Sequence, residues 1–155
     1  MQQHMLQSAT LAERDGQPPE MVAACLLHDF GHLVHDLDDD IADHGIDAIH
    51  EELGANHLRE WFCDEIVEPG RLHVAAKRYL CGTDASYLDG LSAASVQSLE
   101  LQGGPMSTDE IREFEEHPFW RQALTLRHYD DLGKQTDMET PELEHFRPLL
   151  MSFVK

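Results

Sequence analysis

The sequence lacks long hydrophobic runs and contains few basic residues. No apolar stretch approaches the roughly 18–20 residues of a membrane-spanning helix, and the polar first residues do not resemble a signal peptide. Only 11 Lys and Arg residues stand against 30 Asp and Glu residues, so the formal net charge is −19. This charge argues against nucleic acid or an anionic membrane as a partner, because both are bound through cationic surfaces.

Cysteine is also scarce, and no segment shows the alternation of a β-strand. The three cysteines, Cys25, Cys63 and Cys81, cannot form a fully paired set and show no Cys-x-x-Cys spacing. We therefore expect reduced thiols and a cytoplasmic protein. The length of 155 residues suits one domain with a real core. Together these features predict a single all-α domain over residues 1–155.

The sequence does contain a succession of helical segments separated by Gly and Pro. Pro18-Pro19 opens one of them, and Ser107 with Glu110 fits a capping box. Pro69-Gly70 and the segment 81–84 are expected to be breaks between helices, and the five aspartates within 35–45 predict a solvated loop. The expected helices cover residues 2–14, 19–29, 47–62, 71–80, 92–101, 107–116, 118–132 and 141–153.

The pair His28-Asp29 follows the apolar run Met21–Cys25. An ionised Asp is costly in a protein interior unless it is paired or bound to a metal. Met21, Cys25 and His28 share one stripe of the predicted helix. The sequence therefore predicts that this helix delivers His28 and Asp29 to the interior.

Further histidines and aspartates on separate helices can complete a metal centre around this pair. Any one of the eleven histidines is as readily a surface or core residue, but helices of an antiparallel bundle can each send one ligand to a shared centre. Six groups exceed the needs of one tetrahedral zinc and suit two octahedral metals, with imidazole and oxygen ligands favouring iron or manganese. Asp29 is the expected bridge. The candidate ligands are His4, His28, Asp29, His50, His73 and Asp130.

Several segments resemble the HD-domain proteins, and in particular the mixed-valence diiron oxygenases, which include myo-inositol oxygenase and the PhnZ/TmpB-type organophosphonate oxygenases. The His-Asp pair is shared with HD hydrolases, but His4 ahead of it and Lys77 four residues after His73 favour the oxygenase branch. The segments that carry the resemblance are 4–9 (HMLQSA), 27–33 (LHDFGHL), 50–55 (HEELGA), 73–80 (HVAAKRYL), 91–99 (LSAASVQSL) and 126–134 (LRHYDDLGK).

The resemblance implies a helical bundle with a central dimetal site that holds two iron ions as an Fe(II)/Fe(III) pair. One iron would take His4, His28 and Asp130, the other would take His50 and His73, and Asp29 would bridge them with a solvent-derived oxygen. Asp131 is the alternative to Asp130, which aligns better with the family's aspartate. The residues expected to be catalytic are His28, Asp29 and Lys77.

The resemblance also implies a reaction. A small 1-hydroxyphosphonate, of the 2-amino- or 2-trimethylammonio-1-hydroxyethylphosphonate type, would be cleaved at its C–P bond with O₂ to give phosphate and a carboxylate. His32, Lys77, Ser95 and Arg127 would bind the substrate. Arg127 can equally neutralise a nearby carboxylate, and Ser95 can serve close helix packing.

Other residues and functions complete the expectations. Gln7 is a candidate to steady His4 or Asp29, whereas Glu51 and Glu52 are expected on solvated faces. One alternative function is a phosphohydrolase that acts on a phosphomonoester or nucleotide with manganese or another divalent metal. A second is a non-catalytic module that binds a small anion. Relatives carry a Tyr and a Glu shortly before the first ligand helix, so we expect an N-terminal lid segment to be missing from this sequence.

Overall fold

The computed structural model describes residues 1–33 and 47–155, with side chains described for residues 1–33 and 51–155. The predicted acidic loop within 35–45 and the side chain of His50 lie outside the described residues. The described residues contain helices and no strand, which confirms the all-α prediction. The helices are α1 (Gln2–Arg14), α2 (Pro19–Leu27), η1 (Phe30–His32), α4 (Asp47–Leu58), α5 (Asp64–Arg71), α6 (His73–Thr83), α7 (Ala85–Asp89), α8 (Ala93–Leu101), α9 (Thr108–Glu115), α10 (Trp120–Leu132) and α11 (Leu143–Phe153).

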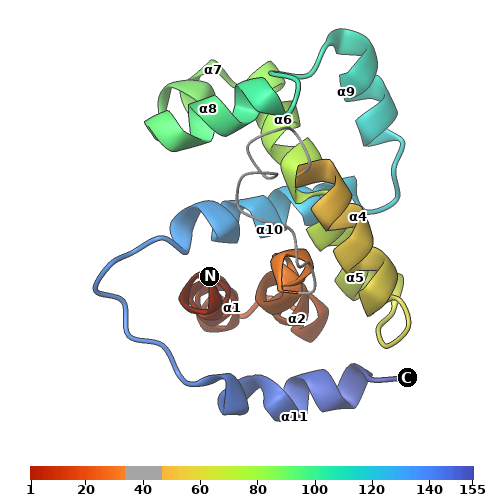
Figure 1. Ribbon diagram of the computed structural model, residues 1–155, viewed down its shortest axis with the longest axis vertical. Helices are drawn as coiled ribbons and strands as arrows, with labels where there is room; N and C mark the ends of the chain where they lie inside the picture. The colour runs from red at the N-terminus through yellow and green to blue at the C-terminus, as the bar shows by residue number, and fades with distance from the viewer. Residues whose placement is uncertain (34–46) are drawn as a thin grey trace.

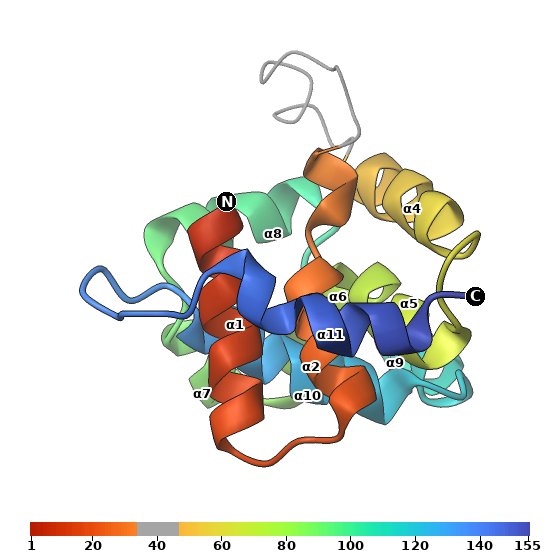
Figure 2. The same cartoon turned by 90° about the horizontal axis from the view of Figure 1, so that it is seen from below.

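Helices α1 and α2 lie at the centre of one half of the molecule. Helix α10 covers one side of this pair and α11 covers the other (Figure 1). Figure 2 shows α11 crossing in front of both helices. Helix α10 also packs against α5 and α6, and α2 packs directly against α5, so both helices connect the α1–α2 pair to the rest of the bundle.

The core explains why these segments are helices that pack together. Every residue of α2 from Met21 to Leu26 is buried, as expected for a helix that is apolar on all sides. Helix α10 instead buries a single stripe, which contains Ala123, Leu126 and Tyr129 but also Arg127 and Asp130. Two charged residues within a buried stripe are costly unless they have partners. The partners of Arg127 and Asp130 lie in the site described below.

Some predicted boundaries were wrong. The segment after Phe62 forms two helices, and α5 continues through Pro69 and Gly70, which were expected to break it. Proline removes only one helical hydrogen bond there, two residues before the helix ends. A side chain in place of Gly70 would lie 3.2 Å from the Cα atom of His28, so this glycine permits close packing of α5 on α2. Helix α7 was missed, although Asp84 caps it by accepting bonds from two backbone N–H groups.

Two glycines set the position of α4 against the segment that follows α2. A Cβ atom built on Gly54 would lie 2.7 Å from the Cα atom and 2.8 Å from the nitrogen of Gly31. Both atoms belong to the backbone, so the contact cannot be relieved by a side-chain rotation. The two backbones can approach this closely only because Gly54 has no side chain.

We predict that Gly54→Ala lowers the free energy of unfolding by about 1–3 kcal/mol, the usual cost of forcing extra atoms into a packed contact. Urea denaturation measures the change. Gly90→Ala is the matched control, because its Cβ would meet nothing closer than 3.5 Å and its φ is −83°. Equal stability of the two variants would show that α4 adjusts freely.

Candidate metal centre

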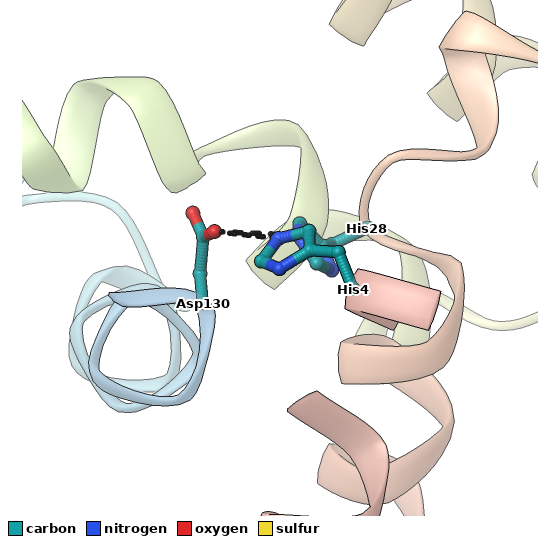
Figure 3. A group of neighbouring side chains, drawn as sticks. All are labelled: His4, His28 and Asp130. Carbon is teal, nitrogen blue, oxygen red and sulfur yellow. Dashed lines mark hydrogen bonds and ion pairs between the residues drawn. The ribbon is translucent and has the colours of Figure 1, made fainter. Parts of the chain in front are cut away.

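The predicted inward delivery of His28 and Asp29 is confirmed by their position. Helix α2 ends at Leu27, and His28 follows as its C-cap residue with a fully buried side chain. His73 is the first residue of α6 and is also buried. Helices α1 and α10 bring His4 and Asp130 to the same place (Figure 3).

The three histidine rings are oriented by one repeated interaction. Each ring places Nδ1 against a backbone carbonyl oxygen: His4 on Gly133 at 2.7 Å, His28 on Cys25 at 2.6 Å, and His73 on Gly70 at 2.6 Å. A carbonyl can only accept a hydrogen bond, so Nδ1 must carry the proton. In the neutral ring Nε2 then presents a lone pair to the centre of the site.

The Nε2 atoms of His4 and His28 converge with a carboxylate. They lie 3.2 Å from one another, and Oδ1 of Asp130 lies 2.9 Å from the first and 3.6 Å from the second. Figure 3 shows Asp130 reaching from α10 toward the two rings. Lone pairs and a carboxylate repel one another at these distances unless a cation lies among them, so this group can hold a proton or a metal ion.

The two carboxylate oxygens of Asp29 face different histidines. Its Oδ2 lies 3.6 Å from Nε2 of His4 and 3.4 Å from Nε2 of His28. Its Oδ1 lies 3.6 Å from Nε2 of His73. This is the orientation that a carboxylate needs to bridge two metal ions.

The electrostatics of the centre keep both carboxylates ionised. Burial would raise the pKa of Asp130, but hydrogen bonds to His28 and His4 and the charge of Arg127 hold that pKa well below its usual range. Burial opposes but does not prevent a lowered pKa of Asp29 beside His28 and His73. Burial would lower the pKa of His28, yet the two aspartates raise it to about 9. Burial instead lowers the pKa of His73, so in the absence of a metal His28 is the histidine that the two carboxylates hold in its protonated form.

Lys77 is buried one helical turn after His73. Its Nζ atom donates a hydrogen bond to Oε1 of Gln102 at 3.0 Å. Burial, reinforced by the charge of Arg127, lowers the pKa of Lys77 to about 8. A buried ammonium group in an acidic protein is a candidate partner for an anion.

Arg127 lies between the two adjacent aspartates of α10. Its Nη1 atom is 3.0 Å from Oδ2 of Asp130, and its Nη2 atom is 2.8 Å from Oδ1 of Asp131. The carboxylate of Asp131 also accepts a hydrogen bond from Tyr87 at 2.6 Å. Of the two aspartates that the sequence left open, Asp130 faces the histidines, as expected, and Asp131 faces Arg127.

The remaining predicted substrate residues lie farther out. Ser95 is half-buried and lines a pocket of about 420 Å³ together with Tyr87 and Lys134. Its hydroxyl accepts a hydrogen bond from Ser92 at 3.0 Å. His32 is exposed at the end of η1.

Gln7 acts at a different place from the one expected. Its side chain makes two hydrogen bonds with the backbone of Gln135, at 2.7 and 2.9 Å. It thereby tethers the segment after α10 whose Gly133 carbonyl holds His4. The expectation that Gln7 bonds directly to His4 or Asp29 is not met by these contacts.

Sequence reasoning missed three residues near the centre. Glu51 was expected on a solvated face, but its Oε1 lies 3.6 Å from Nε2 of His73. Its position directly after His50 was the available signal. Tyr87 and Gln102 were missed because their partners, Arg127 and Lys77, are distant in the sequence.

The comparisons with known proteins agree with this geometry. The family model described as HD domain matches residues 1–88. The chain is 47% identical over 154 residues to 1-hydroxy-2-(trimethylamino)ethylphosphonate dioxygenase (glycine-betaine-forming) of Leisingera caerulea, covering 99% of this chain and 79% of the relative. It is 44% identical over 146 residues to hydroxymethylphosphonate dioxygenase of Gimesia maris, covering 93% and 72%.

A third relative, an uncharacterised protein of Acanthamoeba polyphaga mimivirus, is 34% identical over 154 residues, covering 98% of this chain and 70% of the relative. The chain therefore belongs to the HD-domain family, in its branch of organophosphonate dioxygenases. This confirms the resemblance found in the sequence. None of the helices described here is long and apolar enough to cross a membrane.

We predict that Arg127→Met destabilises the metal-free protein by about 3 kcal/mol or more, because the buried carboxylate of Asp130 and the half-buried carboxylate of Asp131 lose their shared cation. Chemical denaturation in the presence of a chelator measures the change. Arg147→Met is the matched control, since its ion pair with Glu144 is exposed and should be worth less than about 1 kcal/mol. A similar small loss in both variants would contradict the assigned role of Arg127.

Proposed function

We propose that this protein is a diiron oxygenase that cleaves the C–P bond of a small 1-hydroxyphosphonate with O₂. The observation that carries the proposal is the convergence of histidine Nε2 lone pairs on Asp29 and Asp130. The donor set fits a metal, because each ring is already fixed through Nδ1 and the second carboxylate oxygen of Asp130 is held by Arg127. Imidazole with carboxylate is the donor chemistry of non-haem iron.

In this proposal one metal ion is held by His4, His28 and Asp130, and a second by His73 and His50. Asp29, whose two oxygens face different histidines, would be shared between the two sites. Two iron ions in the Fe(II)/Fe(III) state would supply the redox chemistry with O₂. The protein holds the ligands in place and sets the charge around them.

The substrate class follows from the relatives and from the buried cations. Two of the three relatives are named as dioxygenases of hydroxylated phosphonates. Lys77, one turn from His73, can bind a phosphonate oxygen as an ammonium ion. Ser95, in the neighbouring pocket, is the second candidate contact. His32 and Arg127 remain candidates for the same anionic group.

The proposal predicts a redox-active metal centre. Protein loaded with iron under air-free conditions should give the EPR signal of a coupled Fe(II)/Fe(III) pair, and addition of a hydroxyphosphonate should change that signal. His4→Ala should lose the signal and the O₂-dependent release of phosphate. His128→Ala, an exposed histidine on α10, is the matched control and should keep both. Full activity of His4→Ala would refute the ligand assignment.

The same experiment separates the oxygenase from a hydrolase. A phosphohydrolase would release phosphate from phosphomonoesters without O₂, and its rate would not depend on the redox state of the metals. Equal turnover of a phosphomonoester in the absence of O₂ would therefore overturn the proposal.

Lys77 predicts a pH dependence. Burial lowers the pKa of Lys77 from its ordinary 10.5 to about 8, so the anion-binding ammonium form is present below pH 8 and is lost above it. We expect kcat/KM, which reports ionisations of the free enzyme, to fall as the pH rises through about 8. Lys77→Arg keeps its charge in this range and should lose that fall, even if its activity is lower. The pH profiles of the wild type and Lys77→Arg are measured with the same substrate, so the substrate's own ionisation affects both equally. Identical profiles would exclude Lys77 as the titrating group.

A further inference from the structure

All three nitrogen atoms of the Arg127 guanidinium group are engaged inside the protein. Nη1 lies 3.0 Å from Oδ2 of Asp130. Nη2 and Nε donate to Oδ1 of Asp131 at 2.8 and 3.2 Å. The guanidinium is buried and only 6% of its side chain is exposed. A substrate anion would therefore meet a guanidinium group whose three nitrogens are already paired with aspartates and that has little exposed surface.

Tyr87 closes this arrangement from a different helix. Its hydroxyl donates to Oδ2 of Asp131 at 2.6 Å and accepts from Nε of Arg127 at 3.2 Å. Burial raises the pKa of Tyr87, so the hydroxyl keeps its proton. Tyr87, Asp131 and Arg127 thus form a closed triangle of hydrogen bonds that joins α7 to α10.

The triangle determines which atoms of Asp130 remain available. Because Asp131 and Tyr87 fix Nε and Nη2, Nη1 is aimed at Oδ2 of Asp130. Oδ1 is then the oxygen that faces His4 and His28. An arginine without these two partners could rotate to either oxygen, and the carboxylate could turn with it.

We propose that Tyr87 and Asp131 are positioning residues that act through Arg127 to hold Asp130 in one-oxygen binding of the metal. This inference rests on the proposed metal-binding function. In this arrangement only Oδ1 of Asp130 would be free to bind a metal ion together with His4 and His28, because Oδ2 is paired with Arg127. Groups that orient a metal ligand in this way commonly contribute 10–100-fold to metal affinity or activity.

Tyr87→Phe tests the inference, because it removes one hydroxyl and keeps the ring. Tyr79→Phe is the matched control: the Tyr79 hydroxyl makes the same kind of bond, to Oε1 of Glu115 at 2.7 Å, at an exposed position. Mn(II) is titrated into each metal-free protein, and the EPR signal of free Mn(II) reports binding. We expect Tyr87→Phe to weaken Mn(II) binding roughly tenfold, and Tyr79→Phe to leave it unchanged.

Asp131→Asn provides a second variant of nearly the same shape. We expect it to weaken Mn(II) binding at least as much as Tyr87→Phe does. We also expect kcat to fall while KM for a hydroxyphosphonate stays within about twofold, because a residue that acts only through the metal ligand Asp130 does not contact the substrate. Unfolding curves confirm that each variant is folded. A raised KM with unchanged Mn(II) affinity would overturn the inference and assign Arg127 to the substrate.

The outcomes also separate this inference from the proposed function. If the wild-type protein binds no Mn(II) and no iron, the metal-binding function fails and the inference fails with it. If the wild-type protein binds metal and Tyr87→Phe binds it equally well, only the positioning role is overturned.

Discussion

The site depends on hydrogen bonds between histidine Nδ1 atoms and backbone carbonyls. The carbonyls of Cys25 and Gly70 belong to the last turns of α2 and α5, where helices have carbonyls without intrahelical partners. His28 and His73 each follow three residues later and bond back to them. Each of these histidines thus donates a hydrogen bond to a carbonyl at a helix end, and the same bond fixes the orientation of its ring. The carbonyl of Gly133, directly after α10, does the same for His4.

This anchoring explains how an acidic protein can concentrate carboxylates in its interior. Asp29 and Asp130 lie at the meeting point of four elements, and their charges are balanced by histidines, by Arg127 and, in the proposed function, by metal ions. Lys77 adds a second buried cation at the centre of a chain with a net charge of −19. The surface charge would repel an anionic substrate, so the cations are placed where the reaction would occur.

Local signals in the sequence predicted local structure well. The capping box of Ser107 and Glu110 is present at the start of α9, and the apolar segment before His28 forms a helix that is buried on all sides rather than along one stripe. Predictions failed where packing overrode local preference. Helix α5 continues through Pro69, which removes only one hydrogen bond two residues before the helix ends, and Glu51 lies near His73 on the helix whose Gly54 contacts the backbone of Gly31.

The sequence by itself determined the class of fold, the family and the choice of His4, His73 and Asp130 as neighbours of His28-Asp29, because helical periodicity and the order of His and Asp residues are local properties. Only the tertiary structure decided which ring nitrogens face inward, which oxygens of Asp29 face which histidines, and that Asp130 rather than Asp131 faces them. Neighbouring aspartates have the same chemistry. Their different surroundings arise from Arg127 and Tyr87, whose positions depend on the packing of α7 against the bundle.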